Sequence, residues 1–469
     1  MRKTAIFLAA LLVLSVGGAC VAAAGVYQAH DQVVLTETVT YGDRTAADGL
    51  TVVSRTEYDG HLFWDTVCTL DDGLAAKSDY AFSAARVSKK WKWRFTGVNL
   101  NTASGWYSSS WEFPETPTGL ERAYKELSDA VGPGEERTKE IVLSDYVDRY
   151  PVSVELDFPD LRGYSFWPFT EGDPEPGTEY DAAARLEEYF RIPVLEGERR
   201  EISIEKYSDG TVGGAGISSV GDCFGMWTYS ALTDDACYFT FDTHSSEGRV
   251  VDTSEIPGGY GIYRLPYEED RHDESGQKVC SVDVDGLEMV CPLDPEVELN
   301  GLTVNEKKDR LILRAVEDGE DVLTVIDLET FAVRQKLPLG ESLYRLYDEG
   351  DFLVAWTGEN LTVFSCTDGG DYALEFTCAA APEGESLYDR YPAWDFDGEK
   401  LVLADVLERE VKSMGWTQES CGFFVQVYDK TGLLYRGEYR SSLDTGESSL
   451  GGYDCLHRGD GALSVHWQK

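Results

Sequence analysis

Residues 310–328 read RLILRAVEDGEDVLTVIDL, and this stretch decides the fold class. Two short runs of aliphatic and β-branched residues flank Asp318-Gly319, a dipeptide that suits the positive φ angles of a two-residue hairpin turn. Asp-Gly recurs along the chain, often between similar runs, with its aspartate at Asp48, Asp59, Asp72, Asp209, Asp285, Asp368, Asp397 and Asp460. The pattern predicts an all-β chain of short antiparallel strands.

Helical periodicity is scarce. Residues 120–131 read LERAYKELSDAV and carry apolar residues at intervals of three or four. We therefore expect one short helical insertion near residues 118–132, which ends at Gly132-Pro133-Gly134. A weaker helical pattern runs from Tyr180 to Tyr189.

The C-terminal third contains a degenerate repeat. Glu341–Tyr344 (ESLY) recurs as Glu385–Tyr388 and, in degraded form, as Glu447–Leu450 (ESSL). An aspartate-rich turn and a strand follow each copy, and the strands read DFLVAW, KLVLAD and ALSVHW. A period of roughly 40 to 50 residues built from four short strands is typical of β-propeller blades. A loop insertion at residues 408–420 would explain the longer second interval.

Residues 322–340, VLTVIDLETFAVRQKLPLG, resemble the outer strands of YVTN-type and quinoprotein-like propeller blades. The resemblance covers residues 296–469 and implies a propeller architecture without an active site. The stretches DGHLFWDTVCTL (59–70) and SDYVDRYPVSVEL (144–156) also resemble exported proteins of unassigned function from Gram-positive gut bacteria. That second resemblance implies no particular chemistry.

At ~45 residues per blade, residues 31–469 could hold up to nine four-stranded blades, and we expect about seven once the helical insertion and the long loops are left out. The final strand, ALSVHWQK, has too little sequence after it to complete a blade. We expect an early strand such as Leu50–Tyr58 to pair with it, which would tie the chain ends together and remove exposed strand edges. The alternative is an incomplete propeller beside a separate N-terminal β-domain.

We expect residues 1–30 to be a membrane anchor or a signal segment. Arg2 and Lys3 precede an uncharged run about as long as the ~20 residues that cross a bilayer. The small residues Ala22–Ala24 offer a cleavage site, and Cys20 a less favoured lipidation site. Residues 31–469 are therefore expected outside the cytoplasm, on a single-pass anchor at the cell membrane or secreted after cleavage.

Asp and Glu outnumber Lys and Arg by 85 to 41, so the net charge is −44. Without Arg2 and Lys3, 39 cations and 85 anions give the exported part a charge of −46. This charge argues against nucleic acid and anionic lipid as partners, because proteins bind both mainly through Lys and Arg. Solubility outside the cell accounts for the charge, and calcium binding is the alternative.

Cys280 and Cys291 form a candidate disulfide. In a hairpin with a two-residue turn at Asp285-Gly286, the numbers of any two paired residues add up to the sum of 285 and 286. The numbers 280 and 291 have that sum, so the two cysteines would lie opposite each other. Two free buried thiols are the alternative. The chain has no CxxC motif, so neither a zinc ribbon nor a thioredoxin-like redox motif is indicated.

Common catalytic signatures are missing: the chain has no GxSxG, HExxH or GxxxxGK[ST] motif. Asp283-Val-Asp285-Gly286 and Asp395-Phe-Asp397-Gly398 place two carboxylates before a glycine, but the fifth position counted from Asp283 is Leu287, so a calcium loop does not fit. Hairpin turns explain both copies. The sequence thus assigns no catalytic residue, no metal ligand and no cofactor.

A basic strand at residues 87–95 (VSKKWKWRF) stands out in this acidic chain. From Lys90 onward, Lys90, Lys92 and Arg94 alternate with aromatic residues, so the cations share one face of a strand. Neighbouring carboxylates or solvent would satisfy that face in an ordinary structural role.

The functional alternative takes the same three cations as a ligand site. Trp106 and Trp111, in the run GWYSSSWEF at residues 105–113, would add stacking surfaces for an acidic or sugar-containing component of the cell wall.

Together these features predict a membrane-anchored extracytoplasmic β-propeller. It would act as a non-catalytic binding, sensing or protein-interaction scaffold at the cell surface, with a protein or a cell-wall glycan as partner. The alternative from another class is an exported carbohydrate-active hydrolase with paired carboxylates in a Trp-lined pocket.

Overall fold

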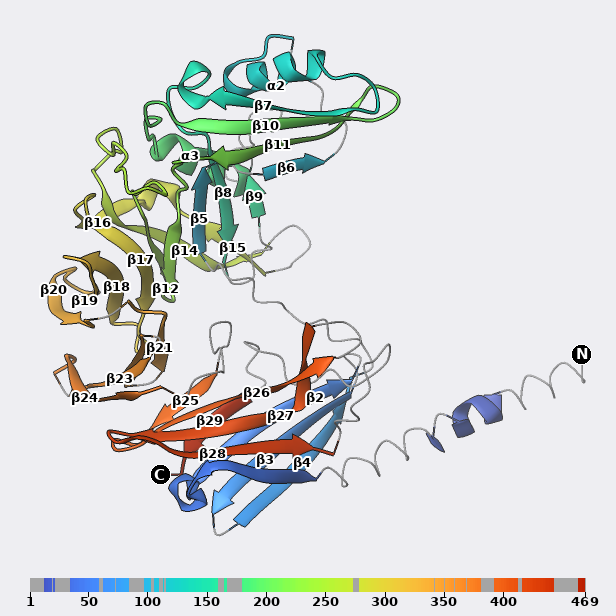
Figure 1. Ribbon diagram of the computed structural model, residues 1–469, viewed down its shortest axis with the longest axis vertical. Coiled ribbons are helices and arrows are strands. Elements are labelled where there is room, and N and C mark those ends of the chain that lie inside the picture. The colour runs from blue at the N-terminus through green and yellow to red at the C-terminus, as the bar shows by residue number, and fades with distance from the viewer. Residues whose placement is uncertain are drawn as a thin grey trace, which may run out of the picture. The chain divides into compact units, whose positions relative to one another are not determined.

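The computed structural model in Figure 1 covers the chain from end to end and is described here for the ranges that follow. They are residues 12–18, 20–21, 34–58, 62–71, 73–83, 97–102, 105–108, 113, 115–158, 164–166, 179–272, 278–340, 342–349, 351–357, 359–367, 369–380, 392–411, 416–442 and 463–468. Within these ranges no helix is both long and apolar enough to cross a membrane. The expected anchor at residues 1–30 falls mostly outside them.

Two compact units make up the chain, residues 1–92 with 343–469 and residues 93–342. In the described residues the two units together contain seven small antiparallel sheets, a mostly-β structure that fits a propeller-like fold. A single closed ring over residues 31–469, and the alternative of a separate N-terminal β-domain, both stay predictions.

The first unit contains three of these sheets. One has the order β1 (Leu35–Gly42), β28 (Gly432–Ser441), β27 (Trp416–Asp429), β26 (Leu401–Val411), β25 (Ala393–Phe396). The next has the order β29 (Leu463–Trp467), β2 (Leu50–Tyr58), β3 (Leu62–Asp71), β4 (Gly73–Phe82). The last runs β21 (Arg345–Glu349), β22 (Phe352–Trp356), β23 (Asn360–Cys366), β24 (Tyr372–Ala379).

The expected pairing of the chain ends is confirmed. β2 pairs with β29 in an antiparallel register that places Val52 opposite Val465. Both side chains are buried in a core shared by the sheets of β2 and β26, which also holds Leu50 and Val425. A second pairing of this kind was not expected. β1 pairs with β28 and so becomes the fifth strand of the sheet that β25, β26, β27 and β28 form. Strands from the early and late parts of the sequence therefore pair with each other in two sheets of the first unit.

The degenerate repeat is only partly reflected in the structure. β22 and β26 follow the first two copies, and each lies one strand in from an edge of its sheet, β22 beside β21 and β26 beside β25. β29 follows the third copy but stands first in its order. The third copy is thus not equivalent to the other two in position.

Four sheets make up the second unit. The first two are β5 (Gly97–Thr102), β8 (Val152–Asp157), β9 (Tyr164–Phe166), and β6 (Gly105–Ser108), β11 (Val212–Val220), β10 (Arg199–Lys206), β7 (Glu136–Val142). The third is β12 (Thr228–Leu232), β13 (Ala236–Phe241), β14 (Gly261–His272), β15 (Lys278–Val282), with β16 (Glu288–Pro292) also on β14. The fourth is β17 (Glu298–Val304), β18 (Arg310–Glu317), β19 (Glu320–Asp327), β20 (Val333–Pro338).

The hairpin at residues 310–328 forms as predicted. β18 and β19 pair up to Glu317 opposite Glu320, and the two residues between them have positive φ angles, 53° at Asp318 and 83° at Gly319. These angles are those of a type I′ turn, which glycine adopts without steric cost. The stretch that resembles a propeller blade supplies the third and fourth strands of the sheet, β19 and β20.

Both helical patterns are confirmed. α2 spans Gly119–Asp129 and α3 spans Glu179–Tyr189, so the described residues of the second unit contain two α-helices rather than one helical insertion. α2 buries Leu120 and Leu127 in the core of the unit, on the same stripe that the sequence pattern shows. α2 packs against β10, and α3 packs against β8.

We expect Val465→Ala to lower the free energy of unfolding by about 1–2 kcal/mol, because it deletes two methyl groups from a side chain that is 1% exposed. His466→Ala changes the exposed neighbour on the same strand and should cost less than about 0.5 kcal/mol. Urea unfolding followed by tryptophan fluorescence measures both variants. Equal effects would contradict the packing of β29 in this core.

Candidate functional site

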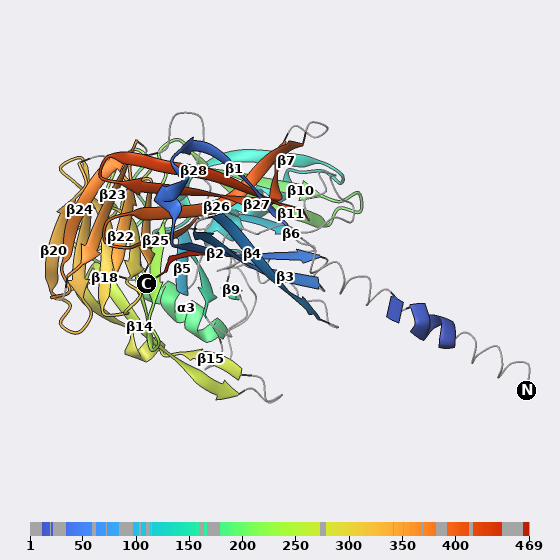
Figure 2. The same ribbon diagram turned by 90° about the horizontal axis from the view of Figure 1, so that it is seen from below.

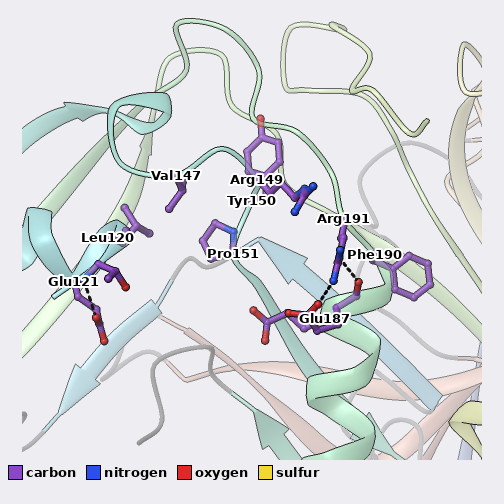
Figure 3. A pocket seen from close by; sticks show the side chains of 12 residues that line it. Leu120, Glu121, Val147, Arg149, Tyr150, Pro151, Glu187, Phe190 and Arg191 are labelled. Carbon is purple, nitrogen blue, oxygen red and sulfur yellow. Dashed lines mark hydrogen bonds and ion pairs between the residues drawn. The ribbon is translucent and has the colours of Figure 1, made fainter. Parts of the chain in front are cut away.

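A cleft of about 400 Å³ opens in the second unit, between the first turn of α2, the segment Val147–Pro151 and the end of α3. Figure 3 shows Glu121 on the α2 side and Glu187 on the α3 side. The residues that line the cleft are Thr118, Gly119, Leu120, Glu121, Val147, Arg149, Tyr150, Pro151, Glu187, Glu188, Phe190 and Arg191.

Backbone pairing fixes the middle wall of the cleft. The Tyr150 N–H donates to the Ile192 carbonyl at 2.9 Å, and the Val194 N–H donates to the Asp148 carbonyl at 3.1 Å. An isolated bridge joins Arg149 to Pro193. The chain that leaves α3 therefore runs antiparallel beside Val147–Pro151.

A buried ion pair lies behind this wall. Glu198 and Arg200 are 1% and 2% exposed, and the Arg200 Nε donates to a Glu198 carboxylate oxygen at 2.8 Å. The other Glu198 oxygen accepts from the Tyr150 hydroxyl. Burial, followed by this hydrogen bond to Glu198, raises the pKa of Tyr150 well above its ordinary value. Tyr150 is thus a neutral donor that holds the wall of the cleft against the ion pair.

Further hydrogen bonds complete the surroundings of the pair. Arg200 donates to the Ser219 hydroxyl at 2.8 Å and to the Phe224 carbonyl at 2.7 Å. The Phe224 N–H donates to Glu198 at 3.2 Å, and the Leu195 N–H donates to the Tyr150 hydroxyl at 3.1 Å. Buried charges are tolerated where every donor and acceptor has such a partner.

Arg200→Met should cost about 3–5 kcal/mol of folding free energy, because it leaves the Glu198 carboxylate buried without its cation. Arg199→Met is the matched control, since Arg199 pairs with Glu140 at the surface and both side chains are about half exposed. The control should cost about 0–1 kcal/mol. Chemical denaturation measures the free energy of unfolding of both variants. Similar losses would show that the buried ion pair contributes no more to stability than the surface pair does.

Most charges around the cleft have a partner. Arg149 pairs with Glu255 at 2.6 Å, and Arg191 pairs with Glu188. Glu121 accepts from the Thr118 backbone N–H at 3.2 Å and so caps α2.

Glu187 is different: in the described part of the chain its carboxylate has neither an ion pair nor a hydrogen bond. Burial, and then repulsion by the adjacent Glu188, raise the pKa of Glu187 to about 7.

The raised pKa predicts how stability depends on pH. The folded chain holds the Glu187 proton more tightly than the unfolded chain, whose glutamates titrate near pH ~4.3. The tighter hold on this proton stabilises the folded chain. The stabilisation is complete below pH ~4.3 and is lost as the pH rises through about 7.

We therefore expect Glu187→Gln to be more stable than the natural chain at about pH 8, by on the order of 1 kcal/mol after solvent screening. The difference should vanish near pH ~4. Thermal unfolding across this pH range measures it. Glu196→Gln removes the same charge from an exposed residue and should show no such trend; identical pH profiles for the two variants would contradict the burial of Glu187.

The described lining of this cleft includes none of the predicted ligand residues. Lys90, Lys92, Arg94 and Trp111 lie outside the described residues, so their site stays a prediction. The backbone of Trp106 is in β6, opposite Gly216, and its side chain is likewise not described.

Sequence reasoning missed Glu187, although a signal was present. Glu187 follows Ala183 by four positions and precedes Phe190 by three, and both side chains are buried, Ala183 on α3 and Phe190 directly after it. An acid on the apolar face of an amphipathic helix is unusual because burial disfavours its charged form.

The predicted hairpin between Cys280 and Cys291 is wrong. β15 and β16 pair with different stretches of β14 and not with each other. β16 pairs with the N-terminal part of β14, and β15 pairs with its C-terminal part (Figure 2). Cys291 is opposite Ile262 and is a buried free thiol, while the Cys280 side chain is not among those described. The cause is the connection: a 3-10 turn at Val284–Gly286 replaces the expected two-residue turn.

Only one of the two aspartate-glycine motifs forms the predicted hairpin turn. Asp397 accepts from the Lys400 N–H at 2.7 Å between the paired strands β25 and β26. Asp283 accepts from the Gly286 N–H at 3.2 Å in the 3-10 turn, which joins two strands that do not pair with each other. Across the described ranges, no three His, Cys, Asp or Glu side chains come together as metal ligands.

Comparisons with known proteins do not identify a family. No protein-family model matches the chain, and neither does any curated protein. Among solved structures, the chain is similar to the dihydro-heme d1 dehydrogenase NirN in complex with DHE, at 11% identity and a TM-score of 0.23. That match covers 53% of this chain, which spans only 44% of the NirN chain.

Two further similar structures cover more of the chain. A functionally unknown protein from Desulfotomaculum acetoxidans DSM 771 is 9% identical over 88% of this chain and 100% of its own, with a TM-score of 0.26. The Cps50 (Swd1) β-propeller domain from Myceliophteria thermophila is 9% identical over 70% of this chain and 88% of its own, with a TM-score of 0.23. β-Propellers are thus among the similar structures, but scores this low carry no argument about family, activity or ligand.

Proposed function

We propose that this chain is an extracytoplasmic binding protein without catalytic activity, which holds its ligand in the cleft between α2 and α3. The observation that carries the proposal is the cleft itself: a hollow of about 400 Å³ with one partly buried carboxylate, Glu187, which has no partner among the described residues. Clefts of this size accommodate small molecules or a short segment of a polymer.

The walls support binding because they are held in place before a ligand arrives. Tyr150 is 4% exposed and is fixed through its hydroxyl to Glu198, while Phe190 is fully buried at the end of α3. A preformed site loses less conformational entropy on binding than a site that must first become ordered.

A carbohydrate-active hydrolase is the second candidate, and one observation favours it. Glu187 has a pKa of about 7, as the general acid of a glycosidase needs. However, Glu121 caps α2 and Glu188 pairs with Arg191, so neither is free to be the second carboxylate. The described lining also contains no Trp on which a sugar could stack.

The setting of the binding site follows from the sequence. An N-terminal anchor at residues 1–30 would hold the protein at the outer face of the cell membrane, or cleavage there would release it. The charge of −44 disfavours nucleic acid and anionic lipid, and leaves a protein or a cell-wall glycan as the partner class. The basic residues Lys90, Lys92 and Arg94 would form a second contact surface for such a partner.

The test is retention of wall and membrane fractions from the chain's own cell by the full chain, purified in detergent and immobilised. The variant Arg149→Gln with Glu187→Gln changes the cleft, and Glu196→Gln is the surface control. The proposal predicts a retained component that the cleft variant loses by about tenfold or more and the control keeps.

Equal retention by the cleft variant would overturn the proposal. Release of reducing sugars from the wall fraction by the natural chain, but not by Glu187→Gln, would establish the hydrolase instead.

A further inference from the structure

The charges around the cleft between α2 and α3 leave one group without a counter-charge. Arg149 is matched by Glu255, Arg191 by Glu188, and the positive end of α2 by Glu121. Glu187 alone has no partner among the described residues.

The position of Glu187 strengthens its negative potential. It lies in the last turn of α3, where the helix carbonyl groups attract cations, and that turn contains no basic residue. Glu188 is adjacent and adds repulsion. Arg191, just beyond the helix, donates to the Glu188 carbonyl at 2.8 Å and pairs with the Glu188 carboxylate. A partly buried carboxylate in this position is stabilised by a bound cation more than one in water would be.

The shape of the site decides what kind of cation fits. No three carboxylate, imidazole or thiol groups of the described chain converge as a metal site, so a bare metal ion would lack ligands here. The cleft is large enough for an organic molecule, and Val147 and Pro151 give it an uncharged wall. Arg149 and Arg191 on the rim would repel a ligand with further positive charges.

We propose that the cleft binds a small organic monocation through one primary ammonium group, which donates hydrogen bonds to the Glu187 carboxylate. The neutral body of the ligand lies along Val147 and Pro151. This inference rests on the proposed binding function and names the chemical class of its ligand.

Protonation of Glu187 competes with the ammonium group. Among the described side chains, the charged groups on α3 and on the elements around it are Arg185, Glu188, Arg191, Glu121, Arg149, Glu155, Asp157, Asp283 and Asp285. Of these, only Glu188 acts on the Glu187 pKa, and Arg185 is paired with Asp285. Since the Glu187 pKa is about 7, affinity for an amine should increase as the pH rises through neutrality.

The experiment measures binding to the full chain in detergent by isothermal titration calorimetry. One pair of probes is n-butylamine and its neutral counterpart N-butylacetamide, and the other is glucosamine and N-acetylglucosamine. Binding of n-butylamine alone, or of glucosamine alone, distinguishes an alkylamine from an amino-sugar ligand. Either result supports the proposal if the acetylated counterpart fails to bind.

We expect n-butylamine to bind about tenfold more tightly at pH ~8 than at pH ~6, because an alkylamine with a pKa near ~10 is charged at both values. Glu187→Gln should weaken amine binding at pH ~8 by about tenfold or more. Glu196→Gln should leave it unchanged. Circular dichroism confirms that each variant is folded.

Equal binding of amines and their acetylated forms would overturn the proposal, as would no binding of any amine at millimolar concentration or an unaffected Glu187→Gln variant. In each of those cases, retention of a wall or membrane component that still depends on the cleft would leave the proposed function standing with a ligand of another class.

Discussion

The buried ion pair between Glu198 and Arg200 is the constraint on which the second unit depends. Two charges with almost no exposure are stable only where the surrounding groups complete their hydrogen bonds, and those groups come from separate parts of the chain. Tyr150 comes from the wall of the cleft, Ser219 from β11, and Phe224 from the loop before β12. Satisfying one ion pair therefore fixes three segments against β10.

That arrangement keeps the cleft rigid, and Glu187 determines its chemical character. The wall at Val147–Pro151 is held from behind by the Tyr150 hydroxyl and from the side by Ile192 and Val194. Facing it, Glu187 lowers stability near neutral pH because its charge is partly buried. Sites that carry such a cost are often functional, since a ligand can supply the missing interaction.

The local features of the fold could be predicted from the sequence. Asp318-Gly319 closes its hairpin because the turn chemistry is contained in two residues, and the apolar stripe of α2 lies on the core as its spacing predicts. Cys280 and Cys291 were misplaced because the Asp283 side chain closes a different turn. The cleft was beyond prediction, because Tyr150, Glu187 and Glu198 are brought together only by long-range packing, although Glu187 on an apolar helix face was a visible clue.

Hydrogen exchange at the backbone amides of Leu195 and Phe224 tests the central claim most directly, because both amides donate into the buried cluster. The account predicts that Tyr150→Phe lowers the protection of both together, while the Leu299 amide, which donates to Asp242 elsewhere in the unit, keeps its protection. Unchanged protection at Leu195 and Phe224 would contradict the claim that the ion pair holds the cleft in place.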